Sequence, residues 1–269
     1  MEQILIFTDL DGTLIDHDTY DFEAARPALD QIRSRSIPVI ICSSKTRAEI
    51  EVYRQRMGLS DPFIVENGGA VFIPAHALNL TGVNFVERGG YHVVELGLAY
   101  AELCATWKKI KTKGNFRMKG FCEMTVEEIA ILSGLPPEEA RWAASREYSE
   151  PFTFSDAPER LALLRRLLQE KGLTVTRGGR FYHVTGKHDK GKAVQILTKA
   201  YARTYPESRL CSVGLGDSAN DIPMLRNVDK PILIRKKTGG CERIPGIKPF
   251  LCSEQPGPRG WAEAIQKIL

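Results

Sequence analysis

Residues 37–42, IPVIIC, form a near-continuous apolar run that is bounded by polar segments with helical periodicity. Such a run is typical of a strand that is covered on both faces within a parallel sheet. Residues 3–8 and 63–66 are predicted to be further strands, and residues 23–34 and 46–57 are predicted to be amphipathic helices. Strand, helix, strand, helix and strand in this order predict a parallel sheet with right-handed crossovers.

The same alternation resumes near the end of the chain. Helices are predicted at residues 190–204, 219–226 and 259–268, and strands at residues 210–215, 231–234 and 248–252. The two parts together predict an α/β fold with one doubly wound, mostly parallel sheet. We therefore expect residues 1–81 and 187–269 to form one core domain.

The middle of the chain, residues 82–186, has a different pattern. It combines an alternating strand at 91–96 with several helices, and it ends in a hairpin around the turn Arg177-Gly178-Gly179. We expect these residues to form an α+β cap inserted into the core.

Composition excludes several classes of protein. The net charge of +4, from 37 Lys and Arg against 33 Asp and Glu, is too small to indicate nucleic-acid binding. No apolar run approaches the roughly 18–20 residues of a membrane span. The six cysteines contain no CxxC pair, so neither zinc-ligand spacing nor a small disulfide framework is predicted. We expect a reduced, cytoplasmic monomer or homodimer that binds a small molecule, with no nucleic-acid or membrane partner.

Unusual polar residues follow the predicted strands, where α/β sheets bind ligands. Asp9 and Asp11 follow the first strand in IFTDLDGTL, and Ser43 and Ser44 follow the second. Later in the chain Lys190 precedes a helix, and Asp217, Asn220 and Asp221 follow the strand CSVGL.

These residue types suit phosphoryl transfer. Several carboxylates in one cleft repel one another unless a cation neutralises them, and oxygen ligands favour Mg²⁺. Hydroxyls, a lysine and the backbone N–H groups of a helix start can bind a phosphate. Asp9 is positioned as a nucleophile and Asp11 as a general acid and base.

The pattern resembles the haloacid dehalogenase superfamily of phosphatases over nearly the whole chain. Its motifs are present here as Asp9-Leu10-Asp11-Gly12-Thr13, Ser43, Lys190 and the segment GDSAND at residues 216–221. The resemblance implies that Asp9 forms an aspartyl-phosphate and that Asp11 is the acid/base. It also implies that Ser43 and Lys190 hold the phosphoryl group, and that Asp9, Asp11, Asp217 and Asp221 bind Mg²⁺. Lys190 is preferred over Lys187 and Lys192 because it directly precedes Gly191 and a helix, and Ser43 is preferred over Ser44. We expect Asn220 to support the phosphate site.

The stretches VENGGAVFIP, SSKTRAE, REYSEPF and TRGGRFYHV look like the mannosyl-3-phosphoglycerate phosphatase family. The resemblance implies hydrolysis of 2-O-mannosyl-3-phosphoglycerate to phosphate and mannosylglycerate, a compatible solute. Such a phosphorylated glycosyl-glycerate carries a carboxylate and a hexose that the cap must recognise. Arg177 and Arg180 are candidates for the carboxylate, because arginine binds carboxylates bidentately. Ser149, Glu150 and His183 are candidates for the sugar or glycerate.

Three alternatives remain open from the sequence. The same chemistry could act on another sugar phosphate, such as the glucosyl analogue. A phosphomutase would use the same pair of aspartates but return the phosphoryl group to its substrate. A sugar-phosphate-binding module without catalysis would retain only the fold.

Overall fold

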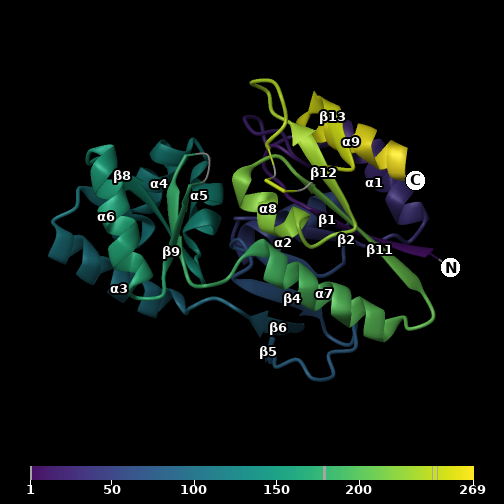
Figure 1. Cartoon of the computed structure of the whole chain (residues 1–269), viewed down its shortest axis with the longest axis horizontal. Coiled ribbons are helices and arrows are strands. Elements are labelled where there is room, and N and C mark those ends of the chain that lie inside the picture. Colours follow the sequence, from purple (N-terminus) through teal and green to yellow (C-terminus); the bar gives the residue numbers. More distant parts are fainter. Residues whose placement is uncertain (1, 178–179, 244, 247) are drawn as a thin grey trace.

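The computed structural model describes residues 2–177, 180–243, 245–246 and 248–269 of the chain. Its described residues form a nine-stranded sheet with the order β13-β12-β11-β1-β2-β3-β4-β6-β5 and a separate four-stranded sheet, β7-β8-β10-β9. Figure 1 shows the two sheets in neighbouring units, with both chain termini at the far end of the larger unit. The prediction of an α/β fold with a mostly parallel sheet is confirmed.

The parallel part of the large sheet is built from both ends of the chain. Its strands are β1 (Glu2–Thr8), β2 (Val39–Cys42), β3 (Phe63–Val65), β11 (Arg209–Gly216), β12 (Lys230–Arg235) and β13 (Leu251–Pro256). Strand β1 lies between β11 and β2, and Thr8 is paired with Leu215 on one side and Ile41 on the other. The strand order therefore reverses at β1, and residues that follow β1, β2 and β11 meet at one edge of the sheet.

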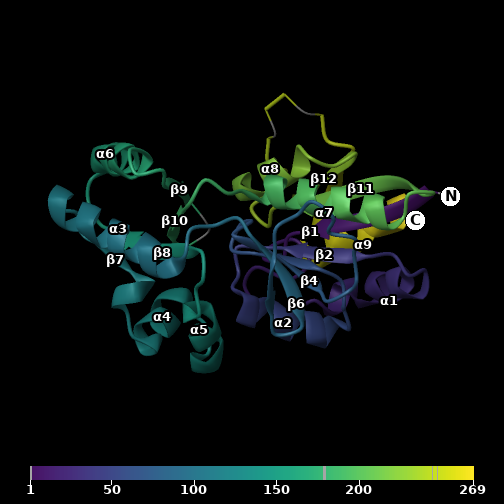
Figure 2. The same ribbon diagram turned by 90° about the horizontal axis from the view of Figure 1, so that it is seen from below.

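Helices cover both faces of this sheet because the side chains of β1 alternate between two apolar clusters. Ile6 packs in the cluster formed with α1 (Arg26–Ser34), α2 (Arg47–Met57) and α9 (Gly257–Ile268). Phe7 packs in the cluster formed with α7 (Lys190–Thr204) and α8 (Ile222–Leu225). Figure 2 shows α7 on the opposite side of the strands from α1 and α2. The 3₁₀ segments η1 (Glu23–Ala25) and η3 (Ala219–Asp221) directly precede α1 and α8.

Three antiparallel strands extend the large sheet beyond β3. They are β4 (Ala70–Pro74), β6 (Tyr91–Glu95) and the edge strand β5 (Val86–Arg88). Residues 82–95 were expected in the cap, yet β5 and β6 pair with the core sheet, and Val93 and Val94 are buried in its two clusters. The division into residues 1–81 with 187–269 and residues 82–186 stays a prediction, and strand pairing alone places the transition after Glu95.

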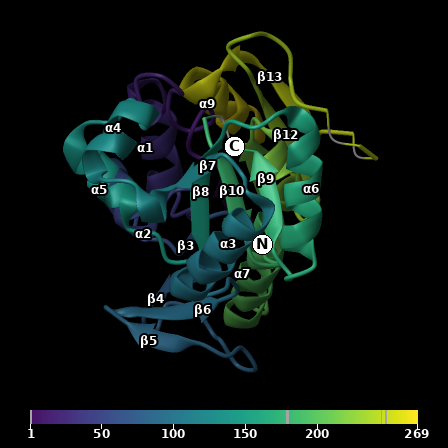
Figure 3. The ribbon, with the colours of Figure 1, turned by 90° about the vertical axis from the view of Figure 1, so that its left-hand side faces the viewer.

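The smaller unit is an antiparallel sheet with helices. Its strands are β7 (Met118–Gly120), β8 (Ser149–Phe154), β9 (Thr174–Arg177) and β10 (Tyr182–Thr185). Helices α3 (Tyr100–Gly114) and α6 (Pro158–Gln169) share an apolar cluster with β8 and β10 that includes Trp107 and Phe152. Helices α4 (Val126–Ser133) and α5 (Pro137–Ala144) form a separate cluster with η2 (Phe121–Glu123), and Figure 3 shows these two helices beside the sheet. The predicted turn at Gly178 and Gly179 lies outside the described residues.

A buried carboxylate joins the two units. Glu66 follows β3 and accepts hydrogen bonds from the N–H groups of Glu147 and Tyr148 at 2.8 and 3.1 Å, and from Ser149 Oγ at 2.6 Å. These donors lie at the start of β8, so the loop after β3 fixes the start of the smaller sheet. No helix among the described residues combines the length and the hydropathy of a transmembrane span.

The expectation of a fully reduced protein is wrong. Cys241 and Cys252 form a disulfide, with their Cα atoms 6.5 Å apart. The loop after β12 folds back so that Cys241 reaches Cys252 near the start of β13, which is a contact that cysteine spacing does not encode. Cys42, Cys104, Cys122 and Cys211 are not part of this disulfide.

Candidate active site

The loops after β1 and β11 and the start of α7 bring three charged side chains together. Lys190 is the first residue of α7, and its Nζ donates to Oδ1 of Asp9 at 2.7 Å and to Oδ1 of Asp221 at 2.6 Å. All three side chains are buried, and Lys190 is 1% exposed. The side chain of Asp189 caps α7 by accepting from the N–H of Lys192 at 3.0 Å, which fixes the helix start where Lys190 can reach both carboxylates.

The surroundings set the charge states of this cluster. Burial and the Asp221 carboxylate raise the pKa of Asp9 well above its usual range, against the opposing effect of Lys190. Burial lowers the pKa of Lys190, but Asp221 and Asp9 raise it more, so the net direction is upward and the lysine is charged. The predicted Lys190, rather than Lys187 or Lys192, therefore lies against the carboxylates, since the other two are exposed.

Asp217 lies beside Asp9 and Asp221, and one lysine does not neutralise these three carboxylates, which we call the acidic group. Ligand atoms of Asp9, Asp217 and Asp221 lie within 4.8 Å of one another. If all three carboxylates are ionised, one ammonium leaves two net negative charges. Without a further cation, burial followed by the Asp221 charge raises the pKa of Asp217 to about 7. Gly12 has a φ of +79°, and a Cβ there would come within 2.9 Å of Asp217 Oδ2, so glycine lets the two loops approach. Oxygen donors with an excess of two negative charges fit a hard divalent cation such as Mg²⁺.

Asp11 lies apart from this cluster and faces a second lysine. Lys45 Nζ lies 3.1 Å from Asp11 Oδ1 and 3.4 Å from Glu49 Oε1. Burial lowers the pKa of Lys45, while Asp11 and Glu49 raise it more, so its ammonium is charged. Asp11 is the more accessible of the two N-terminal aspartates, with 28% of its side chain exposed. Two residues apart, Asp9 and Asp11 thus have different environments, which suits different chemical roles.

The remaining polar candidates of the core lie around these groups. Ser43 is fully buried, and its Oγ accepts from the N–H of Lys45 at 3.3 Å. Ser44 lines the cleft between the two units, and its carbonyl accepts from Arg146 at 2.8 Å. Asn220 donates to the side-chain oxygen of Asn67 at 3.2 Å, which connects the loops after β11 and β3.

The cleft between the two units has a volume of about 150 Å³, and it extends from Asp11 to the four-stranded sheet of the smaller unit. His183 and Arg180 line it, together with Lys45, Glu49 and Arg146. His183 is buried, and no described residue forms a hydrogen bond with its Nδ1. Burial, followed by the positive charge of Arg146, lowers the pKa of His183 to about 3, so its imidazole is neutral.

Three other cap candidates do not line this cleft. Arg177 is exposed, with its guanidinium 5.4 Å from the centre of the Tyr182 ring. Ser149 is occupied by its hydrogen bond to Glu66. Glu150 is fully buried and accepts from Tyr100 Oη at 2.5 Å and from the N–H of Cys122 at 3.0 Å. Successive residues of a strand face opposite sides, so neighbouring positions of β8 cannot share one binding surface.

Sequence reasoning did not identify Lys45, Glu49 and Arg146 as cleft residues. The capping box of α2 contains the one available signal: Thr46 Oγ1 accepts from the N–H of Glu49 at 3.2 Å, and Glu49 Oε2 accepts from that of Thr46 at 2.9 Å. This capping box predicts that α2 starts after Thr46, and it therefore places Lys45 directly before the helix. Arg146 reaches Ser44 from the other unit, a contact across 102 positions that no local pattern encodes.

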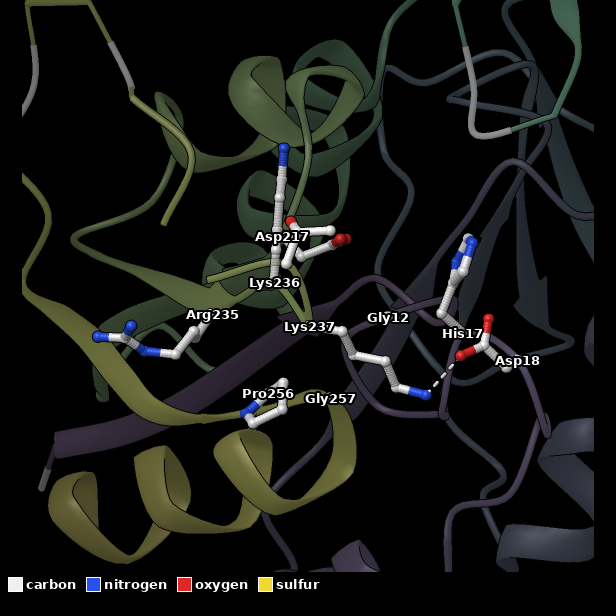
Figure 4. Close-up of a pocket in the computed structure, with 10 residues that line it drawn as sticks. Gly12, His17, Asp18, Asp217, Arg235, Lys236, Lys237, Pro256 and Gly257 are labelled. Carbon is white, nitrogen blue, oxygen red and sulfur yellow. Dashed lines mark hydrogen bonds and ion pairs between the residues drawn. The ribbon is translucent and has the colours of Figure 1, made fainter. Parts of the chain in front are cut away.

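A second cavity, of about 350 Å³, opens beside Gly12 and Asp217 on the core side. Arg235, Lys236 and Lys237 line it, and Lys237 Nζ donates to Asp18 at 2.7 Å. Figure 4 shows Lys237 reaching toward Asp18, whereas Arg235 and Lys236 extend in other directions. The cavity gives the acidic group a second opening, surrounded by positive side chains.

Comparison with known proteins shows the family of this chain. A model of haloacid dehalogenase-like hydrolases matches residues 6–81. A glucosyl-3-phosphoglycerate/mannosyl-3-phosphoglycerate phosphatase of Persephonella marina is 44% identical over 269 residues, which cover 99% of this chain and 97% of that protein. The chain belongs to the haloacid dehalogenase-like hydrolases. A mannosyl-3-phosphoglycerate phosphatase of Pyrococcus horikoshii is 40% identical over 232 residues, covering 86% of this chain and 90% of that one.

Solved structures support the same fold over the whole length. The crystal structure of Thermoplasma acidophilum 0175 matches with a TM-score of 0.70 and 18% identity, and the match covers 99% of this chain and 98% of that one. At that identity the likeness shows the fold alone. The relatives with higher identity are phosphatases, and this haloacid dehalogenase-like protein is accordingly a phosphoric monoester hydrolase.

Proposed function

We propose that this chain is a Mg²⁺-dependent phosphatase that hydrolyses 2-O-glycosyl-3-phosphoglycerate through an aspartyl-phosphate at Asp9. The observation that supports this most is the cleft, whose lining brings Asp11 together with the cations Lys45 and Arg146 and with the neutral imidazole of His183. A phosphate ester that also carries a carboxylate and a hexose matches that combination. The mannosyl compound was expected from the sequence, and the dual name of the Persephonella relative adds the glucosyl compound.

The proposed reaction has two displacements at phosphorus. A carboxylate oxygen of Asp9 attacks, the bond between phosphorus and the C3 oxygen of the glycerate breaks, and Asp11 gives that oxygen its proton. Asp11 then takes a proton from water, whose oxygen attacks the phosphoryl group and releases phosphate and Asp9. Lys190 holds Asp9 in place throughout and stabilises charge on the phosphoryl oxygens.

The acidic group would hold Mg²⁺ through Asp9, Asp217, Asp221 and the backbone carbonyl of Asp11. When bound, Mg²⁺ neutralises negative charge on the transferring phosphoryl group. Asp221 already accepts from Lys190 and from the N–H groups of Asp217 and Ser218. Within the described part of the chain, the side chain of Asp217 accepts only from Thr13 Oγ1, at 3.4 Å. Asp217 is therefore the carboxylate with most capacity left for a cation.

Asp217→Asn is expected to weaken Mg²⁺ binding by more than about 10-fold, since even losing a group that only orients a ligand costs about 10–100-fold. Mg²⁺ titrations by calorimetry and by activity both measure this. Asp18→Asn is the matched control, because Asp18 lines the neighbouring cavity but pairs with Lys237. Equal Mg²⁺ affinity in Asp217→Asn and the unmodified protein would contradict the assigned site.

Arg180 is proposed to bind the glycerate carboxylate from the cap, and Arg177 supplies a matched control on the neighbouring strand. Hydrogen bonds to charged groups contribute about 1.5–3 kcal/mol, so Arg180→Met is expected to raise KM for the glycosyl-3-phosphoglycerate by about 10-fold or more. KM for p-nitrophenyl phosphate, which has no carboxylate, should change little. Steady-state kinetics of Arg180→Met and Arg177→Met on both substrates test this, and equal effects of the two substitutions would contradict it.

Phosphate release from a panel of esters tests the function as a whole. The panel contains mannosyl- and glucosyl-3-phosphoglycerate, 3-phosphoglycerate and several hexose phosphates, each with and without Mg²⁺. We expect kcat/KM for the two glycosyl-3-phosphoglycerates to exceed that for hexose phosphates. Comparable rates on unrelated hexose phosphates would contradict the substrate but not the phosphatase, whereas isomerised sugar phosphate without released phosphate would indicate a mutase.

A further inference from the structure

Glu150 is a buried carboxylate in the smaller unit with no role in the cleft. It is 0% exposed and lies in β8 opposite Val184, whose side chain belongs to the apolar cluster under α3 and α6. Its hydrogen-bond donors are neutral: Tyr100 Oη at 2.5 Å, the N–H of Cys122 at 3.0 Å and Cys104 Sγ at 3.8 Å. These donors carry no charge, and burying an ionised carboxylate in an apolar environment is costly.

Two cysteines from separate elements meet at this carboxylate. Cys104 lies in α3 and Cys122 in η2, and one ligand atom from each of Cys104, Cys122 and Glu150 lies within 4.8 Å of the others. Zn²⁺ binds sulfur at about 2.3 Å and carboxylate oxygen at about 2.0–2.2 Å, so sulfur and oxygen lie about 3.6 Å apart in a tetrahedral site. The 3.8 Å from Cys104 Sγ to Glu150 Oε2 is close to that spacing.

The backbone leaves space for this arrangement. A Cβ at Gly120 would lie 2.0 Å from Glu150 Oε1 and 2.9 Å from the Trp107 ring, so any side chain there would displace the carboxylate. Cys104 is 8% exposed, and Cys122 is partly exposed. An ion can therefore approach from the side of Cys122 while the other two ligands stay covered.

We propose that Cys104, Cys122 and Glu150 bind one Zn²⁺ ion in the smaller unit. Water or the Tyr100 phenol fills the fourth position. Thiolate ligands select a softer ion than the all-oxygen group around Asp9, so the two sites differ in metal as well as in place. This site does not depend on the proposed substrate.

The site also connects to the cleft. Phe121 precedes Cys122 and Pro151 follows Glu150, and both line the cleft between the units. Zn²⁺ would join α3, η2 and β8 and so fix that wall of the cleft. Metal at this position would act on the order of the cap rather than on phosphoryl transfer.

Spectroscopy of the full chain with Co²⁺ in place of Zn²⁺ tests the proposal. Chelator-treated protein that retains the Cys241–Cys252 disulfide is titrated with Co²⁺ in excess Mg²⁺. We expect a thiolate-to-cobalt charge-transfer band that saturates at one ion per chain and disappears when Zn²⁺ is added. Cys104→Ser and Cys122→Ser should lose the band, and Zn²⁺ should raise the Tm of the unmodified protein but not of these variants. Cys211→Ser, which removes a buried thiol of the core sheet, is the control that should keep the band.

Two results would overturn the proposal. One is the absence of a charge-transfer band in the unmodified protein at stoichiometric Co²⁺, which does not depend on any variant folding. The other is a band that persists in Cys122→Ser, whose position is partly exposed. Cys104 and Cys122 could instead form a disulfide in air while the thiol form binds no metal. That result would show that the two thiols are a redox pair and not metal ligands.

Discussion

Asp9→Asn is expected to lower kcat for phosphate release by about 10⁴-fold or more, the scale observed when a nucleophile is removed from an active site. An amide oxygen has little nucleophilicity and leaves no carboxylate to form the acyl phosphate. The substitution keeps the shape of the side chain and an oxygen that can accept from Lys190 Nζ, now 2.7 Å from Asp9 Oδ1. Continuous assay of released phosphate at saturating substrate and Mg²⁺ measures the effect.

Folding and binding must be separated from chemistry in this variant. Circular dichroism and the Tm should show a folded protein, because removing one of three clustered carboxylates relieves repulsion. Substrate binding measured by calorimetry should persist within about 10-fold, since the cleft residues are unchanged. Release of phosphate at the unmodified rate would show that Asp9 is not the nucleophile.

Lys190→Met is expected to produce a large loss of stability, because it removes the only cation among the described residues that forms ion pairs with both Asp9 and Asp221. Breaking a buried ion pair by deleting one partner costs about 3–5 kcal/mol. Lys190 is 0% exposed in its side chain, and Asp9 and Asp221 would face each other without it. Urea unfolding of the metal-free protein at neutral pH gives the change in free energy of unfolding, and phosphate release should also be abolished.

Lys192→Met is the matched control for this substitution. Lys192 lies two positions away on the same helix, but it is exposed, and exposed substitutions change stability by about 0.5 kcal/mol or less. A difference of less than 1 kcal/mol between the two variants would mean that the ion pairs contribute little net stability. The active-site role of Lys190 would then rest on the activity data alone.

Much of the core could be predicted because the residues that specify each strand or helix lie within or next to that element. Apolar runs and capping residues encode strands and helices one at a time, so α7 was predicted at its observed bounds. The carboxylates follow strand ends directly, and a parallel sheet brings strand ends together whatever the intervening chain does. Asp9, Asp217, Asp221 and Lys190 therefore meet as the order of elements indicates.

Contacts between the units could not be predicted in the same way. Arg146 contacts Ser44 across 102 positions, and Glu66 accepts from the N–H of Tyr148 across 82 positions. Ser149 and Glu150 are adjacent in β8, so their side chains face opposite sides of the strand. Ser149 therefore contacts Glu66, and Glu150 contacts Tyr100. Which of the two faces which side depends on the pairing of β8 with β10. The short strand β5 was missed because three residues give no usable periodicity.

In the proposed mechanism the phosphoryl group is transferred to Asp9 before it is transferred to water. The enzyme is mixed with glycosyl-3-phosphoglycerate and Mg²⁺ under single-turnover conditions, and the reaction is quenched in acid within the first turnover. Borohydride reduction and peptide mass spectrometry then identify the phosphorylated residue. We predict a phosphoryl group on the peptide containing Asp9, converted to homoserine at that position and absent from Asp9→Asn. Phosphate release without any labelled Asp9, at time points where one turnover is half complete, would contradict the covalent mechanism.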